Sequence, residues 1–317
     1  MACEIIKPDR ILKELGELWI DTAKSDPGKP GTESGDDGLL RACSMTLISF
    51  VDDEEDSMAL GETLALLMRE HPSRSIVVRL REGEDFLESR VLAQCWKPFG
   101  HRKQICCEQV ELTATMNHLQ DVASVVGPLA VPDLPRLILL RSARIVRAGA
   151  LRKILPLADK IIVDSSRPGA PGFGELGAML DSGHIAGDLA WTRITELRAL
   201  IAHLLGETVP KVITIEYSGR EAGPETRYLE AWLDGGLPDT HVRIKSGGGE
   251  GLGTPLVIRI DDTIVIRPGV GCAEIEMGAL KQRASLAVGR DDELLSAELK
   301  IVVHDPVFER ALNRITA

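Results

Sequence analysis

The sequence predicts an α/β protein of two domains, and three observations lead to this class. Short apolar strand patterns alternate with amphipathic helix patterns over much of the chain. After residue 240 the style changes to consecutive short strands joined by turns. The chain has 317 residues, enough for two cores. We expect an N-terminal helix and flexible linker (1–40), an α/β domain (41–150) and an α+β domain (151–317) with a β-hairpin region and two terminal helices.

Residues 1–40 carry one helix pattern followed by a polar stretch. Over 8–22, apolar residues that include Ile11 and Leu15 fall on one stripe of a helix. Residues 24–38 are rich in Gly, Pro, Ser and Asp, and a segment of that composition cannot bury a core. We therefore expect a helix and a flexible linker ahead of the first domain.

The segment 41–150 alternates strands with helices. An apolar strand pattern over 42–51 precedes a helix that Asp52 or Asp53 caps and that ends near His71. Further strands are expected over 75–80, 89–96, 104–113 and 137–140, and a second helix over 119–129. The last of these strands is apolar throughout, which is typical of a buried parallel sheet.

The segment 151–317 begins with the same alternation of strands and helices and then becomes richer in strands. Asp261-Asp262 is the expected turn of a β-hairpin, and Asp305-Pro306 is a cap followed by a first-turn proline. Strands are expected over 160–164, 212–217, 241–245, 255–260 and 263–267. Helices are expected over 173–180 and 192–205, from Pro224 to Gly236, around 294–302 and from Pro306 onward.

Charge and hydropathy exclude several classes of partner. The formal net charge is −11, which disfavours contact with the nucleic-acid backbone and with anionic membrane surfaces. The first residues have no apolar segment after a basic flank, so no signal peptide is expected. Apolar runs such as 137–140 are far shorter than the ~20 residues of a membrane-spanning helix. We expect a cytoplasmic protein that binds neither nucleic acid nor membrane.

Motifs for cofactor, metal and nucleophile chemistry lack their required context. The glycine cluster at 247–253 precedes a strand, whereas a dinucleotide fingerprint opens a helix. The seven histidines are scattered without metal-ligand spacing. Ser165-Ser166 follows a predicted strand, where it could contact a ligand or cap a helix. We expect no catalytic residue, cofactor or metal, and the chain is not expected to be an enzyme.

Three of the six cysteines are redox candidates. Cys95, Cys106 and Cys107 lie on two predicted strands that could be neighbours in a hairpin, so that one pair could approach disulfide distance. Cysteine is also a small residue that is often buried without reacting. In a reducing cytosol most of the six should be free thiols. The sequence leaves both interpretations open.

The segment 187–195 combines helix-capping and interface residue types. Asp188 can cap an apolar helix, at whose entry lie Trp191 and Arg193. Trp and Arg are enriched among residues that dominate binding at protein interfaces. The alternative is a tryptophan packed under a loop and an arginine paired with a neighbouring acid.

Several segments resemble the glucose-6-phosphate dehydrogenase assembly protein (OpcA) family. The most specific is Asp188-Leu189-Ala190-Trp191-Thr192-Arg193-Ile194 with Arg198 following. Others, in chain order, are HPSR at 71–74, CEQV at 107–110, SVVGPL at 124–129, VPDLP at 131–135 and ELLSAELKIVVHDPVFERAL at 293–312. The chain departs from the family in lacking tryptophans after the PDLP turn and an aromatic residue at Leu197.

The resemblance implies a non-catalytic assembly factor or allosteric activator. Such a protein would bind glucose-6-phosphate dehydrogenase, the NADP-dependent entry enzyme of the oxidative pentose phosphate pathway, and promote its active oligomer. Asp188, Trp191, Arg193 and Arg198 are then candidates for partner binding. The alternatives are an α/β enzyme that binds a sugar phosphate or nucleotide near Ser165-Ser166, and a thiol redox sensor that acts on the dehydrogenase.

Overall fold

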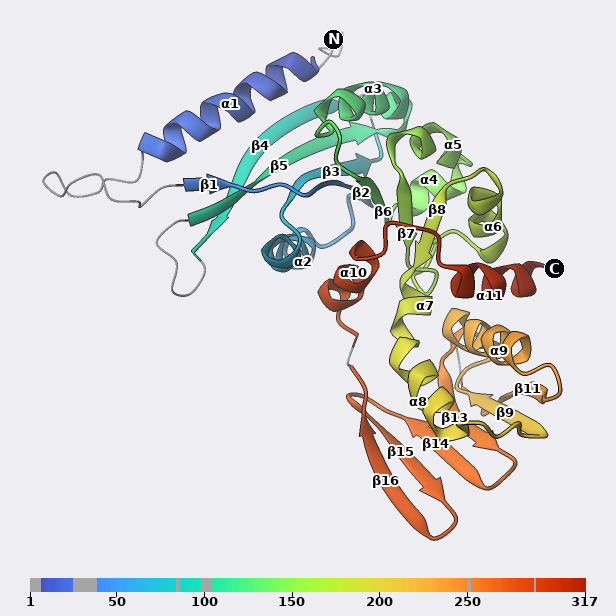
Figure 1. The fold of residues 1–317 in the computed structure, drawn as a ribbon. Coiled ribbons are helices and arrows are strands. Elements are labelled where there is room, and N and C mark those ends of the chain that lie inside the picture. Colours follow the sequence, from blue (N-terminus) through green and yellow to red (C-terminus); the bar gives the residue numbers. More distant parts are fainter. Residues whose placement is uncertain (1–6, 25–38, 84–85, 98–103, 250–251, 288) are drawn as a thin grey trace, which may run out of the picture. The chain divides into compact units, whose positions relative to one another are not determined.

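The computed structural model describes residues 7–24, 39–83, 86–97, 104–249, 252–287 and 289–317 (Figure 1). The flexible linker predicted over 24–38 lies outside these ranges, apart from Lys24 at the end of the first helix. The chain divides into two compact units, Met1–Ile162 and Val163–Ala317. As predicted, the fold is of mixed α/β class, with a largely parallel sheet first and a mixed sheet second.

The first unit is built around a parallel sheet. Its strands run in the order β1-β5-β3-β2-β6-β7, and β4 pairs antiparallel with β5. The elements are α1 (Pro8–Lys24), β1 (Leu39–Arg41), β2 (Met45–Asp52), α2 (Ser57–Glu70), β3 (Ser73–Arg81), β4 (Leu87–Trp96), β5 (Gln104–Thr115), a 3-10 turn (Met116–His118), α3 (Leu119–Leu129), β6 (Arg136–Leu140), α4 (Ala143–Arg147), α5 (Leu151–Ile154), a second 3-10 turn (Leu155–Leu157) and β7 (Lys160–Val163).

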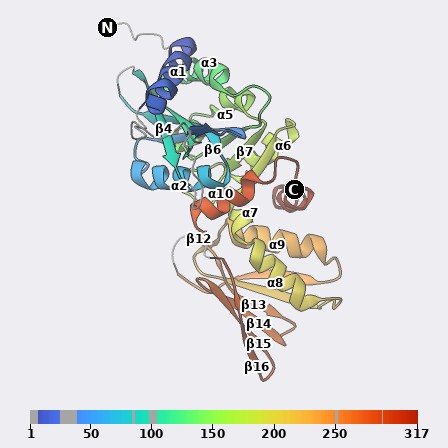
Figure 2. The same cartoon turned by 60° about the vertical axis from the view of Figure 1, so that its left-hand side comes forward.

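Strand order in this sheet reverses at β2. The chain adds β3 and β5 on one side of β2 and then returns to add β6 and β7 on the other. Right-handed crossovers in opposite directions place helices on both faces, and α1 and α3 lie on one face with α2 on the other (Figures 1 and 2). The carboxyl ends of β2 and β6 therefore meet at a topological switch point, the place where open α/β sheets bind ligands.

Burial in the first unit follows the predicted pattern. The central strands are apolar on both faces, and Ile48, Phe50, Val78 and Ile138 are fully buried. The helix predicted after β2 begins later than expected, because Asp56 rather than Asp52 or Asp53 accepts hydrogen bonds from the first turn. It ends at His71, as predicted. Asp52 and Asp53 are thereby left at the end of β2 for other contacts.

The second unit contains a mixed sheet in the order β11-β9-β13-β14-β15-β16, and α8 and α9 lie along one of its faces (Figure 2). Its elements are α6 (Phe173–Asp181), β8 (Ile185–Asp188), α7 (Leu189–Arg193), α8 (Thr195–Leu205), β9 (Val212–Tyr217), β10 (Glu221–Ala222), α9 (Pro224–Gly236), β11 (His241–Ser246), β12 (Leu252–Gly253), β13 (Pro255–Ile260), β14 (Ile264–Pro268), β15 (Cys272–Met277), β16 (Leu280–Ser285), α10 (Asp291–Leu299) and α11 (Pro306–Thr316).

Three details of the second unit correct the sequence prediction. The helix expected over 192–205 is two helices, α7 and α8, that meet at Ile194. Strands β15 and β16 were not predicted, because β16 is an exposed and polar edge strand without apolar alternation. The helix expected around 294–302 ends at Leu299, and Val302 is 44% exposed.

The hairpin predicted at Asp261-Asp262 is confirmed. Both residues have positive φ angles, 47° and 55°, which Asp tolerates better than most residues. Ile260 pairs with Ile264, so the loop has one residue more than predicted. The Asp261 carboxylate also accepts hydrogen bonds from the amides of Lys211 and Val212, which ties this turn to the start of β9.

Candidate functional site

The segment that follows β8 is organised by a buried aspartate. Asp188 is fully buried, and its carboxylate accepts hydrogen bonds from the amides of Ser165 and Ala190, both at 3.0 Å, and from the Tyr228 hydroxyl at 2.9 Å. Burial raises the pKa of Asp188 to about 6 despite these donors. Asp188 therefore caps α7 as predicted and also joins that helix to α9.

Trp191 is a core residue of the second unit. Its side chain is 3% exposed and packs against Tyr228 and Phe308, with ring centroids 5.7 and 5.9 Å away. Its indole Nε1 donates to the carboxylate of Asp305 at 3.3 Å. Tyr228 also packs edge-on against Phe173 at 5.2 Å. In a chain with 3% aromatic residues, this cluster gathers four of them to join α6, α7, α9 and α11.

Arg193 is neutralised by two acids from distant parts of the sequence. Its guanidinium donates to Asp164 at 3.0 Å and to Glu225 at 2.7 Å. Ser166 donates to the same Glu225 carboxylate at 2.7 Å. Glu225, from the first turn of α9, is only 5% exposed and was not singled out by the sequence, since nothing local links it to Arg193. The alternative of an arginine paired with neighbouring acids describes this geometry.

The turn at Ser165-Ser166 lies among charged side chains. The Ser165 amide donates a hydrogen bond to the Asp188 carboxylate, and the Ser166 hydroxyl donates one to the Glu225 carboxylate. Arg167, next in the chain, lies 3.7 Å from Asp291. Arg193 also donates to the Ser166 hydroxyl, at 3.2 Å, so the turn is surrounded by both acidic and basic side chains. These contacts join the serine turn to α7 and α9.

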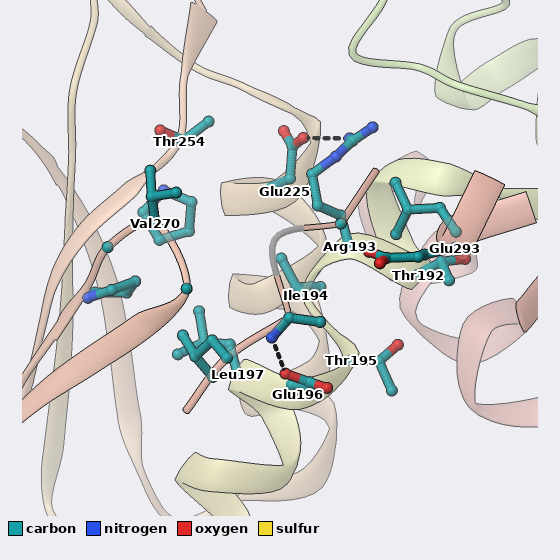
Figure 3. A pocket seen from close by; sticks show the side chains of 18 of the residues that line it. Thr192, Arg193, Ile194, Thr195, Glu196, Leu197, Glu225, Thr254, Val270 and Glu293 are labelled. Atoms are coloured by element: carbon teal, nitrogen blue, oxygen red, sulfur yellow. Dashed lines mark hydrogen bonds and ion pairs between the residues drawn. The ribbon is translucent and has the colours of Figure 1, made fainter. Parts of the chain in front are cut away.

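A pocket of about 640 Å³ opens beside Arg193 (Figure 3). Its walls are mainly apolar, with Ile194 and Leu197 from the α7–α8 junction and Val270 from the β14–β15 turn among them. Its charged lining residues are Arg193, Glu196, Glu225 and Glu293. Because Arg193 and Glu225 pair with each other, the remaining charged lining residues are Glu196 and Glu293, and Glu293 also contacts Arg290 at 3.2 Å. Pockets of this size and apolar lining can take a small molecule or a group of partner side chains.

The switch point of the first unit is filled by ion pairs. Arg144 is 7% exposed and contacts Asp53 at 2.5 Å and Glu54 at 2.6 Å. Its guanidinium also donates to the Leu80 carbonyl at 2.7 Å. Ser142 donates to Asp52. Where a dinucleotide-binding fold has a glycine-rich phosphate loop, this chain has the sequence Asp-Asp-Glu-Glu-Asp at 52–56.

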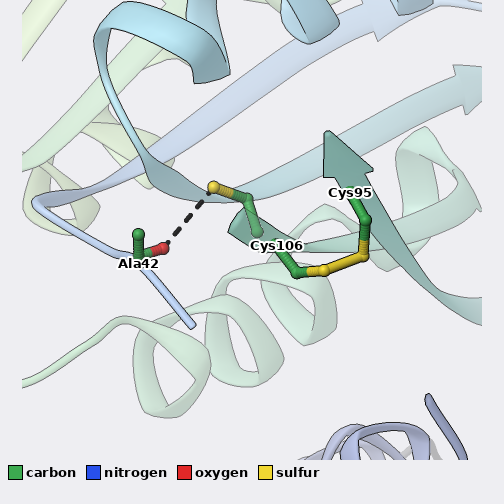
Figure 4. The surroundings of a disulfide bond; sticks show 4 residues. Ala42, Cys95 and Cys106 are labelled. Carbon is green, nitrogen blue, oxygen red and sulfur yellow. Dashed lines mark hydrogen bonds between the residues drawn. A yellow bond between two sulfur atoms is a disulfide. The ribbon is translucent and has the colours of Figure 1, made fainter. Parts of the chain in front are cut away.

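The cysteine candidates separate into a disulfide and a buried thiol (Figure 4). Cys95 and Cys106 face each other in the β4–β5 register and form a disulfide bond. Cys107 points elsewhere, with its Sγ 3.5 Å from the Ala42 carbonyl, and burial raises its pKa to about 11. Of the two interpretations that the sequence left open, the structure shows neighbouring strands with a bond for Cys95 and Cys106, and a buried residue for Cys107. Cys107 is poorly suited to react as a thiolate, while Cys95 and Cys106 are bonded rather than free.

Metal and membrane binding were also considered. Within the described ranges, no group of three His, Cys, Asp or Glu side chains is arranged to hold a metal ion. Over the same parts of the chain, the helices are too short or too polar to cross a bilayer.

Two family models match the chain in succession. The model described as the glucose-6-phosphate dehydrogenase subunit N-terminal domain matches residues 65–178, and the model for the C-terminal domain of that subunit matches residues 185–312. The chain belongs to the OpcA family. The OpcA resemblance predicted from the segments at 71–74 and 188–198 is thereby confirmed, and both segments lie inside the matched ranges.

One curated relative and several solved structures are similar to this OpcA-family chain. The OxPP cycle protein OpcA of Synechocystis sp. is 27% identical over 124 residues, which cover 38% of this chain and 26% of that protein. A biliverdin reductase from Synechocystis sp. has a TM-score of 0.47 at 11% identity, over 86% of this chain and 96% of its own. A UDP-N-acetylglucosamine 3-dehydrogenase from Acidithiobacillus ferrooxidans has a TM-score of 0.46 at 9% identity, over 87% of this chain and 96% of its own. These low scores carry no information about activity.

Proposed function

We propose that this protein is a non-catalytic assembly factor and allosteric activator that binds glucose-6-phosphate dehydrogenase and promotes its active oligomer. The observation that carries the proposal is the succession of both OpcA family models over most of the chain. The Synechocystis relative, named for the oxidative pentose phosphate cycle, matches over about a quarter of its length and supports the same pathway. An activator of this kind stabilises one state of its partner and needs no chemistry of its own.

Charges at the switch point of the first unit and at the pocket of the second unit support a role without catalysis. At the switch point of the first unit, Arg144 is committed to Asp53 and Glu54, so it cannot serve a nucleotide phosphate without leaving acids unpaired. In the second unit, the pocket beside Arg193 is lined by three glutamates. Glucose 6-phosphate and NADP are both anionic, and neither place offers them a free cation among the residues described above.

The partner-binding segment divides into supporting and accessible residues. Asp188 and Trp191 are buried and hold the α7–α8 junction in place. Arg193 reaches the pocket, whose mouth carries Val270 at 89% exposure. Val270 adds to the mainly apolar lining of a pocket that is large enough to take partner side chains. We place the docking of the dehydrogenase on this side of the second unit and on Arg198, at the start of α8.

The direct test is to mix the purified protein with the dehydrogenase from the same organism. We expect co-elution in size-exclusion chromatography and a change in the Vmax or Km of the dehydrogenase. Val270→Asp should weaken the complex at least tenfold without changing the melting temperature, because it adds a charge to an exposed apolar side chain. Arg227→Met, on exposed α9 surface, is the control. If no complex and no kinetic change occur across physiological pH and redox conditions, the proposal is wrong.

The disulfide favours one second candidate, a thiol redox sensor that acts on the dehydrogenase. Cys95 and Cys106 are bonded across two adjacent strands, so reduction would remove a covalent link within the sheet. If activation of the dehydrogenase differs between the reduced and oxidised protein and the difference disappears in Cys95→Ser, the sensor role holds. The rival α/β enzyme is tested by thermal stabilisation with glucose 6-phosphate or NADP alone, which we expect to be absent.

A further inference from the structure

Arg198 occupies an unusual position on the surface of the second unit. It lies in the first turn of α8, and its guanidinium carbon is 3.4 Å from the centroid of the Trp191 ring and 6.0 Å from that of Trp232 on α9. The side chain is half-buried. Stacking on an indole covers the face of a guanidinium and leaves its N–H edges available for a planar acceptor.

The hydrogen bonds of Arg198 are incomplete. Nη2 donates to the Thr195 hydroxyl at 3.0 Å, while Nε is buried without an acceptor. Among the residues that the structure describes, no carboxylate lies within ion-pair distance of Arg198. The negative charge of Asp305 favours the charged form of Arg198. The Asp305 carboxylate, however, already accepts hydrogen bonds from the Trp191 indole and from the Val307 amide, which caps α11. Burial lowers the pKa of Arg198 to about 10.

Several other buried or half-buried arginines of this molecule are paired with carboxylates. Arg74 contacts Glu108 at 2.6 Å and Arg193 contacts Glu225 at 2.7 Å. Arg144, whose Nε also lacks a hydrogen-bond acceptor, contacts Glu54 at 2.6 Å. The chain has 48 acids and 37 Lys and Arg residues, so acids are plentiful. A half-buried guanidinium that lacks a carboxylate in such a chain is therefore a place where an external carboxylate is favoured over water.

We propose that Arg198, between Trp191 and Trp232, binds an Asp or Glu side chain on the surface of the partner dehydrogenase. This inference rests on the proposed function. The planar fork of the guanidinium accepts a carboxylate through two parallel hydrogen bonds, and the indoles exclude water around them. The net charge of −11 repels acidic surfaces in general, so a half-buried cation in an aromatic setting also fixes the register of docking.

The test compares Arg198→Met with a matched loss of charge elsewhere. Arg283→Met removes an exposed arginine from the edge strand β16, where the side chain is 74% exposed. We expect Arg198→Met to bind the dehydrogenase about 30-fold more weakly, as for a charge pair that loses one partner, and to melt at an equal or higher temperature because an incomplete cation is gone. Arg283→Met should change affinity less than about twofold, as for an exposed pair.

Two further measurements sharpen the result. The affinity of the wild-type protein should fall with added salt more steeply than that of Arg198→Met, because screening acts on the charge pair. Arg198→Lys should bind with intermediate affinity, since it keeps the charge and loses the bidentate geometry.

The outcomes separate this inference from the function on which it rests. If the wild-type protein and Arg283→Met bind the dehydrogenase and Arg198→Met binds equally well, the Arg198 site is wrong and the proposed function stands. If Arg198→Met melts several degrees lower, the arginine is structural and the inference is also overturned. If the wild-type protein forms no complex, the proposed function itself fails.

Discussion

The two units treat buried arginines differently. In the first unit, Arg144 is surrounded by carboxylates at the carboxyl end of β2, and Arg74 is paired with Glu108. In the second unit, Arg193 is paired but lines an open pocket, and Arg198 stacks on Trp191 without a carboxylate. Completed ion pairs hold a fold together, whereas an incomplete one is available to a partner. Under the proposed function, the first unit serves as scaffold and the second as the binding module.

Of the substitutions that test this comparison, Trp191→Ala should have the largest effect. The side chain is 3% exposed and packs against Tyr228 and Phe308, so its removal should cost about 3–5 kcal/mol of unfolding free energy. Urea denaturation followed by circular dichroism measures this loss. Trp232→Ala, at a half-buried position on α9, is the control and should cost less. A stable Trp191→Ala protein with a weakened complex would instead mean that Trp191 supports binding, because Arg198 stacks on its ring, more than it supports the fold.

Arg144→Met tests the scaffold role of the first unit. The change leaves the acids of the 52–54 segment without their cation, but Asp53 and Glu54 are 41% and 71% exposed, so water can solvate them and the loss should be about 1–2 kcal/mol. The same denaturation experiment should show the loss. Arg136→Met removes an exposed arginine paired with Asp159 and should cost about 1 kcal/mol or less. Equal effects of the two substitutions would remove the distinction between buried and exposed pairs in this unit.

A pH-dependent effect is expected from the titration of Asp188. Its pKa is raised from 3.8 to about 6 in the folded protein, so the folded state holds a proton that the unfolded state loses between these pH values. The stabilisation from this group is complete below about pH 4 and is lost as pH rises through about 6. Subtracting the unfolding free energy of Asp188→Asn from that of the wild-type protein, measured from pH 4 to 7, should reveal this decline. A difference that is flat with pH would contradict the raised pKa.

Much of the architecture could be predicted because it depends on local pattern. The strand Val212–Tyr217 and the parallel strand β6 were both predicted from apolar runs. The sequence raised the pairing of β4 with β5 as a possibility, but the register of the two strands decided which of Cys95, Cys106 and Cys107 bond. The break between α7 and α8 could not, since Ile194 carries no glycine or proline signal. Strand β16 was missed because cross-strand ion pairs such as Arg283 to Glu274, rather than apolar alternation, accompany it.

By itself, the sequence determined the class of fold and the family, and it singled out the segment from Asp188 to Arg198 as a candidate for partner binding. Only the tertiary structure decided what each residue of that segment does. Trp191 is buried, Arg193 is paired with Glu225, and Arg198 is left without a carboxylate. Helical and strand periodicity arise from neighbours within a few residues. Charge pairing and burial depend on residues brought together from far along the chain, as Arg193 and Glu225 are from 32 positions apart.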